Sequence, residues 1–325
     1  MSKSRYTFWE ERMELIRMRV AARRALTPHI VEFTLVPLHE GALPAFTPGA
    51  HVTVEAPSGA MRRYSLVNDG TAPSKYVIAV KRESAGRGGS ASMHDEAVEG
   101  HELNVKAPEN DFPMADAPRY LLIAGGIGVT PIYAMASHLE REGKDFNIIY
   151  LSRSAGEAAY LEDLTTAFGD RVLAHHDEGD FDRIYDFWDH FAEPQKLSVY
   201  CCGPKPLMDE IRAISGHWPE GRVNFEDFKP VEVVRADDEP FEVELRKSGA
   251  TLTVPANRSI LEAMRDAGLN TVSSCESGTC GTCKTRLLEG EADHRDMVLM
   301  DEEKANNLMI CVSRACPGGR LVLDL

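Results

Sequence analysis

Short runs of alternating apolar and polar residues dominate the first third of the chain. Two examples are Ile30–Leu35 and Tyr76–Val80, and turns rich in proline or glycine, such as Pro48-Gly49, separate the runs. Alternation with a period of two turns one face of a strand toward a core and the other toward solvent. Many short strands at this spacing predict a β-barrel or β-sandwich for this part of the chain.

A second pattern begins at Tyr120. The continuous apolar run Leu121–Ala124 predicts a buried strand, and a helix is expected from Thr130 to about Arg141. Further strands are predicted at residues 147–151, 171–174 and 197–202, with helices near 157–168 and after Pro206. Strands that alternate with helices predict a parallel sheet covered by helices.

The stretch from Lys229 to Pro240 is polar and charged, with a proline near each end, and is predicted to be a linker. Behind it, Phe241–Leu245 alternates as a strand, and Ser259 is a candidate N-cap for a helix. The predicted organisation is a β-barrel domain over 1–117, an α/β domain over 118–230, a linker over 231–240 and a third domain over 241–325.

Four cysteines of the third domain have a spacing that suits an iron–sulfur cluster. Cys275, Cys280 and Cys283 follow the pattern C-x4-C-x2-C, and Cys311 comes after 27 intervening residues. This is the plant-type [2Fe–2S] spacing, and glycines within the loop let it wrap closely around the metal. A zinc site is the alternative, but zinc ribbons usually repeat paired CxxC units and this loop has one. Cys316 does not fit the ligand spacing.

A glycine-rich turn, Gly125-Gly126-Ile127-Gly128-Val129-Thr130-Pro131, follows the first strand of the α/β region. It opens a predicted helix, so its N–H groups could hold a pyrophosphate, and Pro131 suits the first helical turn. A plain tight turn is the alternative, because the motif is not GxGxxG. Cys202-Gly203-Pro204 ends another predicted parallel strand, where open α/β sheets bind their ligands, and this favours the binding site.

Two segments of the barrel region carry candidate flavin chemistry. Arg62-Arg63-Tyr64-Ser65 offers a cation for phosphate, an aromatic face for a ring and a hydroxyl for a ring nitrogen. Arg87-Gly88-Gly89-Ser90 is a candidate anion-binding turn. Taken singly, each also fits an ordinary exposed strand or turn.

Composition narrows the choice of partner and compartment. A net charge of -15 argues against nucleic-acid binding, which depends on phosphate neutralisation by Lys and Arg. We find neither a signal peptide nor an apolar run of membrane-spanning length. The seven cysteines are an odd number and all lie in the second half, which disfavours a disulfide framework. We therefore expect a cytoplasmic protein that binds neither nucleic acid nor membrane.

The order of these motifs resembles a known family along the whole chain. RxYS, GGxGxTP, CGP and a C-terminal C-x4-C-x2-C…C are similar to the ferredoxin–NADP reductase superfamily. More narrowly, the chain resembles the phthalate dioxygenase reductase family, including the vanillate O-demethylase-type reductases, whose tail motifs match His294-Arg295-Asp296 and Cys311-Val312-Ser313-Arg314. The resemblance implies an antiparallel β-barrel flavin domain, an α/β parallel-sheet nicotinamide domain and an α+β plant-type ferredoxin domain of the β-grasp type.

The resemblance also assigns roles to residues. It implies that Arg62 binds the flavin phosphate, that Tyr64 packs on the isoalloxazine and that Ser65 hydrogen-bonds near the reactive ring nitrogen, with Ser65 and Cys202 closest to the chemistry. The remaining flavin positions are Arg63, Ala79, Val80, Lys81, Gly88, Gly89, Ser90 and Phe225. The nicotinamide positions are Gly125, Gly126, Gly128, Thr130, Pro131, Ser152, Arg153, Cys202, Gly203 and Pro204. The cluster ligands are Cys275, Cys280, Cys283 and Cys311.

The activity implied by the resemblance is electron transfer from NADH through FMN and the [2Fe–2S] cluster to a Rieske-type aromatic oxygenase component. A flavin accepts the electron pair of a hydride and releases electrons singly, as the cluster requires. The single arginine beside an acid in residues 152–157 favours NADH over NADPH. The alternatives are FAD in place of FMN, a non-aromatic oxygenase or other acceptor, and a non-catalytic iron–sulfur redox sensor. A sensor would not need both flavin and nicotinamide motifs.

Overall fold

A computed structural model describes residues 15–39, 41–83, 88–228, 235, 237–269, 271–273, 278, 281–296 and 298–325. The chain divides into two compact units, Met1–Phe228 and Lys229–Leu325. No helix among these residues is long and apolar enough to cross a bilayer.

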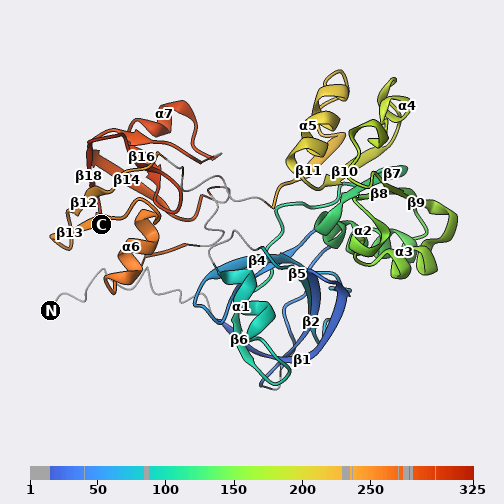
Figure 1. Cartoon of the computed structure of the whole chain (residues 1–325), viewed down its shortest axis with the longest axis horizontal. Coiled ribbons are helices and arrows are strands. Elements are labelled where there is room, and N and C mark those ends of the chain that lie inside the picture. Colours follow the sequence, from blue (N-terminus) through green and yellow to red (C-terminus); the bar gives the residue numbers. More distant parts are fainter. Residues whose placement is uncertain are drawn as a thin grey trace, which may run out of the picture. The chain divides into compact units, whose positions relative to one another are not determined.

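The first part of the first unit is an antiparallel barrel (Figure 1). Its strands follow the order β4-β3-β6-β1-β2-β5, and a bridge between Leu66 and Ile78 joins the two edges of the sheet. Alternate residues of these strands form one buried apolar core, as the period of two predicts. The elements are β1 (Ile16–Thr27), β2 (Ile30–Pro37), β3 (His51–Glu55), β4 (Met61–Ser65), β5 (Tyr76–Lys81), α1 (Gly89–Asp95) and β6 (Glu102–Val105).

The second part of the first unit is a parallel sheet of strand order β11-β10-β7-β8-β9. Helices α2 and α3 cover one face and α4 and α5 the other (Figure 1), and each face has its own apolar core. The strand order reverses between β7 and β10, which creates the crevice where such sheets bind ligands. The elements are β7 (Arg119–Gly125), α2 (Val129–Arg141), β8 (Asp145–Ser152), α3 (Leu161–Phe168), β9 (Val172–His176), α4 (Trp188–Phe191), β10 (Ser198–Cys202), α5 (Lys205–Ile214) and β11 (Val223–Glu226).

A partly buried hydrogen bond joins the barrel to the parallel-sheet part. The hydroxyl of Tyr160 donates to Glu32 of β2 at 2.7 Å, and Arg24 of β1 bridges Glu32 and Asp163 of α3 at 3.0 Å each. Tyr160 takes a left-handed backbone, with φ of 59°, and its ring stacks on Tyr133. Because this conformation interrupts a helix, α3 begins at Leu161, later than the predicted start near 157.

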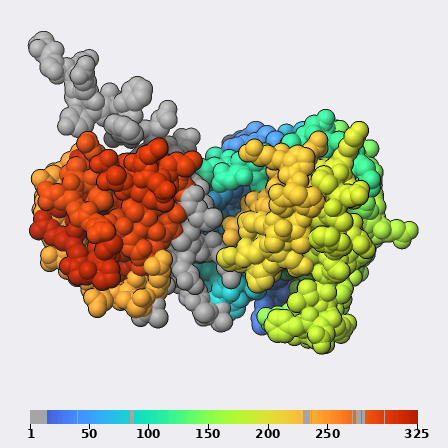
Figure 2. Space-filling model, turned by 90° about the horizontal axis from the view of Figure 1, so that it is seen from above, coloured from blue at the N-terminus to red at the C-terminus, as the bar shows by residue number. Residues whose placement is uncertain are grey.

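The second unit is a mixed sheet of order β13-β12-β18-β14-β16 with α6 packed beside it, and its orange and red atoms form one closely packed body (Figure 2). Ser259 and Glu262 form a capping box at the start of α6, as the predicted N-cap requires. The elements are β12 (Phe241–Leu245), β13 (Ala250–Val254), α6 (Ile260–Asp266), β14 (Lys284–Glu289), β15 (Ala292–Asp293), α7 (Asp301–Lys304), β16 (Asn307–Met309), β17 (Arg314–Ala315) and β18 (Arg320–Leu323).

Replacement of Tyr160 by phenylalanine tests the contact between the barrel and the parallel sheet. The hydrogen bond that Tyr160→Phe removes ends on a carboxylate, so we expect the free energy of unfolding in urea to fall by about 1.5–3 kcal/mol. Tyr133→Phe is the matched control, because the Tyr133 hydroxyl has no hydrogen bond among the described residues. Equal effects of the two variants would contradict the assignment.

Candidate active site

Three glycines bring the loops after β7 and β10 into direct contact. A Cβ atom built at Gly128 would lie 2.2 Å from the carbonyl oxygen of Cys202, and one built at Gly203 would lie 3.0 Å from the Cα of Gly125. At Gly125, a Cβ would lie 2.6 Å from a ring carbon of Pro204. Real Cβ atoms do not approach so closely, so these positions exclude any side chain. The glycines therefore allow the tight turn after β7, and they also allow the loops after β7 and β10 to meet where the strand order reverses.

The same loop leaves the N-terminus of α2 available to an anion. No side chain from the described residues caps this helix, and Gly126, with φ of 54°, has open space where its Cβ would stand. Thr130 is buried, and its hydroxyl donates to the carbonyl of Ile127 at 3.0 Å. Thr130 thus shapes the turn through its side chain, and only its backbone N–H remains for a phosphate.

Cys202 ends β10 on the face of the sheet that carries α2, and it is fully buried. Burial raises the pKa of its thiol well above the ordinary value, and the negative charge of Glu226 adds to this. The thiol is therefore neutral and is not a nucleophile, and its side chain packs in the apolar core under α2.

The barrel strand β4 offers two buried hydroxyl groups without partners. Among the described residues, neither Tyr64 Oη nor Ser65 Oγ has a hydrogen bond. Burial raises the pKa of Tyr64, so its hydroxyl keeps its proton. Buried polar atoms are nearly always satisfied, so two adjacent unpaired hydroxyls point to a missing polar ligand. This fits the bound ring system that the sequence predicts at Tyr64 and Ser65.

The predicted phosphate end of the flavin site lies around Arg62 and α1. A Cβ at Gly89 would lie 2.8 Å from Arg62 Nε, so a larger residue there would displace this side chain, while the φ of 81° at Gly88 is a backbone conformation that favours glycine. Ser90 Oγ accepts the backbone N–H of Glu83 at 3.0 Å and ties the turn to the end of β5. Arg87 lies outside the described residues.

The other predicted flavin positions, in β5, face in different directions. Val80 belongs to the barrel core, whereas Ala79 joins the core under α2, and the exposed Lys81 pairs with Glu83 at 3.1 Å. Val80 can reach a ligand only through its backbone. The flavin roles of all three residues remain predictions.

Sequence reasoning missed Glu226, the last residue of β11. It pairs with Cys202 in register, its Oε2 is buried, and this atom has no hydrogen bond among the described residues. Burial raises its pKa to about 8, against the lowering effect of Arg63 and with a further rise from Asp111. The carboxyl group thus holds a proton between the barrel and the end of β10. The sequence offered one signal for Glu226, which is an acid at the end of the predicted strand that follows Cys202-Gly203-Pro204.

Phe225, the residue before Glu226, has a different environment. Successive strand residues face opposite sides of a sheet, and the Phe225 ring packs under the guanidinium of Arg212 on α5, 4.4 Å from its centre. The proposed contact of Phe225 with the flavin remains a prediction.

The predicted nicotinamide residues of β8 lie at the same edge of the sheet as Cys202. The Ser152 hydroxyl donates to the carbonyl of Ser154 at 3.0 Å and lies 2.8 Å from His176 Nδ1, while Arg153 is exposed. The backbone N–H of Glu178 donates to the carbonyl of Arg153 at 2.8 Å, which joins the end of β8 to the turn after β9.

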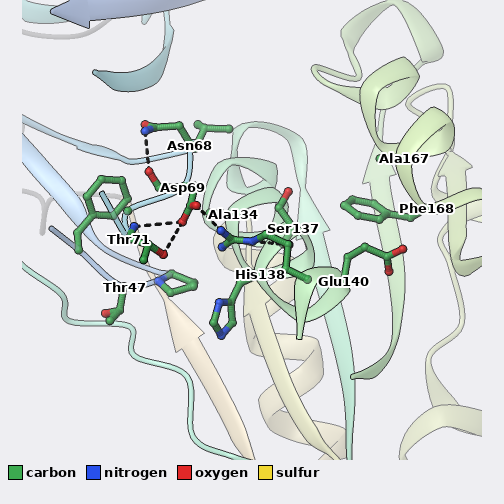
Figure 3. Close-up of a pocket in the computed structure, with 15 residues that line it drawn as sticks. Thr47, Asn68, Asp69, Thr71, Ala134, Ser137, His138, Glu140, Ala167 and Phe168 are labelled. Carbon is green, nitrogen blue, oxygen red and sulfur yellow. Dashed lines mark hydrogen bonds and ion pairs between the residues drawn. The ribbon is translucent and has the colours of Figure 1, made fainter. Parts of the chain in front are cut away.

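A cavity of about 430 Å³ separates the barrel from the outer half of α2 (Figure 3). Its lining includes Phe46, His138 and the ion pair between Asp69 and Arg141. None of the predicted cofactor-binding residues lines it. The cavity is therefore a crevice between two parts of the first unit, closed on one side by an ion pair.

Two of the four predicted cluster ligands lie in the described part of the second unit. Cys283 and Cys311 are both buried in its core, whereas Cys275 and Cys280 lie outside the described residues. A Cβ at Gly278, where φ is 73°, would lie 2.8 Å from a Val312 methyl carbon. Gly278 of the predicted ligand loop therefore lies against Val312, the residue after Cys311, which fits a ligand loop close to the fourth predicted thiolate.

Comparison with known proteins agrees with this arrangement. Residues 243–316 match the family model of the 2Fe-2S iron-sulfur cluster binding domain. Over 314 residues the chain is 46% identical to phthalate dioxygenase reductase of Burkholderia cepacia, covering 95% of this chain and 97% of that relative. A solved phthalate dioxygenase reductase, a modular structure for electron transfer from pyridine nucleotides to [2Fe–2S], is similar with a TM-score of 0.86 at 46% identity, covering 96% of this chain and 98% of its own.

A second solved structure contains the same arrangement inside a longer chain. An intact type IV self-sufficient cytochrome P450 monooxygenase is similar to 96% of this chain, over 41% of its own length, with a TM-score of 0.70 at 35% identity.

The fold, the crevice and the cluster domain define an oxidoreductase that joins a flavin- and nicotinamide-binding reductase to a ferredoxin domain. The chain belongs to the phthalate dioxygenase reductase family. This membership confirms the predicted family, the fold class and the cofactor set of FMN, NADH and a [2Fe–2S] cluster. The roles of individual site residues and the predicted domain boundaries remain predictions.

Replacement of Glu226 by glutamine tests the buried carboxyl group. The folded protein keeps the Glu226 proton up to about pH 8, whereas the unfolded chain loses it near the ordinary value of 4.5. Between these values the folded state binds more protons, so the contribution of this group to stability falls as pH rises. The stability of Glu226→Gln relative to the wild type should therefore increase from about pH 5 to about pH 8.

Urea midpoints of both proteins at the two pH values measure this difference. Asp209→Asn is the control, because Lys205 lowers the pKa of Asp209 below the tested range and its difference should stay flat. A flat difference for Glu226→Gln as well would show that Glu226 is ionised in the folded protein.

Proposed function

We propose that the chain takes a hydride from NADH and passes the electrons, one at a time, to a Rieske-type aromatic oxygenase component. The observation that carries this proposal is the pair of unpaired buried hydroxyls on Tyr64 and Ser65, in one unit with the glycine-lined crevice and in one chain with a plant-type ferredoxin domain. When bound, FMN supplies the conversion of a two-electron donor into a one-electron donor.

The residues of the chain would bind and orient the cofactors and would not themselves react. Arg62 would hold the phosphate beside Gly89, and the Tyr64 and Ser65 hydroxyls would satisfy polar atoms of the ring. The glycine contacts around Gly128 open the crevice to the nicotinamide, against which Cys202 presents an uncharged thiol. Glu226 holds a proton at its buried carboxyl group and adds no negative charge at neutral pH.

Two features of the sequence agree with the confirmed cofactor set. The sequence shows no aromatic segment for stacking an adenine, which favours FMN over FAD. Residues 152–157 contain one arginine beside an acid rather than a positive cluster, which favours NADH over NADPH. A cytoplasmic location is also proposed, because an odd number of cysteines confined to the second half of the chain disfavours a secreted disulfide framework.

One alternative to a Rieske-type acceptor is supported by a specific observation. Curated relatives are named as reductase subunits of oxygenase systems, which supports an oxygenase partner. The cytochrome P450 monooxygenase that contains the same arrangement shows that a chain of this type can also serve a haem oxygenase. Electron transfer to a purified Rieske component, compared with transfer to a P450 haem domain, separates the two.

The variant Cys280→Ser tests the electron path. Loss of one thiolate ligand should remove the cluster, while flavin reduction by NADH continues, because the flavin and nicotinamide residues lie in the other compact unit. Metal analysis, flavin extraction and anaerobic stopped-flow absorbance measure the three components. Recovery of zinc without iron from the wild type, or of no flavin, would overturn the proposed function. Loss of flavin from the variant alone would show that the two units depend on each other.

Salt dependence tests how the ferredoxin domain meets its partner. We propose that acids of the ferredoxin domain, in residues 289–293 and 301–303, steer its docking onto a basic face of the oxygenase component. Several of them are paired, Glu289 with Arg246 and Asp301 with Lys304, while Glu291 and Glu302 form no ion pair with another described residue. If unpaired acids steer docking, transfer to the oxygenase should fall steeply as salt rises, since the Debye length is about 8 Å at physiological ionic strength.

Flavin reduction by NADH in the same salt series is the internal control and should change much less. A transfer rate that stays flat from low to high salt would rule out steering by these acids.

A further inference from the structure

The strand order of the parallel sheet separates the two halves of a bound dinucleotide. The order β11-β10-β7-β8-β9 reverses between β7 and β10. In sheets of this kind the pyrophosphate lies at the helix after the first strand, and an acid near the end of the second strand binds the 2′-hydroxyl of the adenosine ribose. With the nicotinamide proposed at Cys202 on β10, the adenosine side is the carboxyl edge of β8 and β9.

The second strand, β8, ends without an acid. Its last residue is Ser152, and the first acid beyond it is the exposed Glu157. Two residues before Ser152, on the same face of the strand, the Tyr150 hydroxyl lies 3.3 Å from the carbonyl oxygen of Gly126 in the glycine turn. The end of β8 therefore borders the proposed pyrophosphate site, but the usual carboxylate acceptor for a ribose hydroxyl is missing from it.

His176, the last residue of β9, supplies an acceptor at this place. It pairs in register with Ser152, and its Nδ1 lies 2.8 Å from Ser152 Oγ. The serine hydroxyl has a single proton, which it donates to the carbonyl of Ser154 at 3.0 Å. The hydrogen between Ser152 and His176 must therefore come from Nδ1. In the uncharged imidazole the other nitrogen, Nε2, is then an acceptor.

The acceptor nitrogen is free and the ring is held in place. Among the described residues no hydrogen bond reaches His176 Nε2, and the side chain is partly exposed. Arg183 donates to the His176 carbonyl at 3.3 Å. On the other side, the backbone N–H of Asp177 donates to the carbonyl of Ser152 at 3.4 Å. The direction of Nε2 is thus set before a ligand binds, which lowers the entropic cost of a bond to it.

We propose that His176 is a specificity-determining residue: its Nε2 accepts a hydrogen bond from the 2′-hydroxyl of the adenosine ribose of NADH, and Ser152 holds the ring in the required orientation. This inference deepens the proposed function and rests on it. A 2′-phosphate would bring its oxygen atoms against an acceptor nitrogen, so the same contact favours NADH over NADPH.

The test compares ADP with 2′-deoxy-ADP, which differ only in the 2′-hydroxyl, by equilibrium titration of the oxidised holoprotein. The wild type should bind ADP about 2- to 12-fold more tightly, the range for one uncharged hydrogen bond. His176→Phe keeps a flat ring and removes the acceptor, so it should bind both nucleotides equally. His176→Gln, whose amide oxygen can take the place of Nε2, should keep part of the preference.

Stopped-flow reduction of the flavin by NADH gives a second measurement. The ribose takes no part in hydride transfer, so its hydrogen bond contributes equally before and during the reaction. His176→Phe should therefore raise the apparent Kd for NADH about 2- to 12-fold and leave the limiting rate unchanged. For NADPH, kcat/KM should not fall, because NADPH lacks the 2′-hydroxyl.

His175→Phe is the matched control, because it makes the same substitution one residue earlier in β9. Successive strand residues face opposite sides of the sheet, and the His175 ring packs on Tyr185, with ring centres 5.4 Å apart. This variant should keep the preference for ADP and the wild-type Kd for NADH. Equal losses in the two phenylalanine variants would contradict the inference by showing a structural effect.

Equal binding of ADP and 2′-deoxy-ADP by the wild type would overturn the inference, and this comparison needs no variant to fold. A preference that survives in His176→Phe would also overturn it and would assign the acceptor to another group, such as Glu157. Failure of the wild-type flavin to accept a hydride from NADH would instead reject the proposed function, and it is seen before any variant is compared.

Discussion

The contact between the loops after β7 and β10 is the constraint on which the reductase unit depends. At Gly128 a Cβ would stand 2.2 Å from a backbone oxygen of the other loop, and backbone cannot yield as a flexible side chain can. Any larger residue would force the two strand ends apart at the point where the strand order reverses. The crevice, the free N-terminus of α2 and the position of Cys202 all follow from that one approach.

Because successive residues of β10 and β11 face opposite sides of the sheet, the candidate site residues lie on one face and the residues of an apolar core on the other. Cys201 and Phe225 face α4 and α5 and belong to an apolar core, whereas Cys202 and Glu226 face the other way. Cys202 and Glu226 are both uncharged at neutral pH because burial disfavours their ionised forms. Both groups beside the proposed nicotinamide crevice are therefore neutral, while on the barrel side the positive charge of Arg63 is paired with Asp111 at 2.5 Å.

The fold and the broad site were predictable because their signals are local. The apolar runs, the glycine turn and the cysteine spacing each lie within a few residues of one another, and they identified the three kinds of domain in the right order. Glu226 was missed because its one local signal, a place at the end of the strand beside Cys202-Gly203-Pro204, does not separate a buried acid from a solvated one. Its raised pKa comes from burial between the barrel and β10, and only the packing of residues distant in sequence reveals that burial.

Asp238 was misjudged for the same reason, and in the opposite direction. A polar run between prolines has the composition of a solvated linker, since carboxylates are almost never buried unless paired. Here the pairing cations are Arg295, 57 residues away, and Arg314, 76 residues away, and the β15–β17 strand pair sets Arg314 opposite Asp293, which also bonds Arg295. Composition indicates only how often a residue type is buried on average. Whether a particular carboxylate is solvated or anchored depends on whether the fold brings a buried cation to it, and the boundary between linker and domain is therefore a property of tertiary structure.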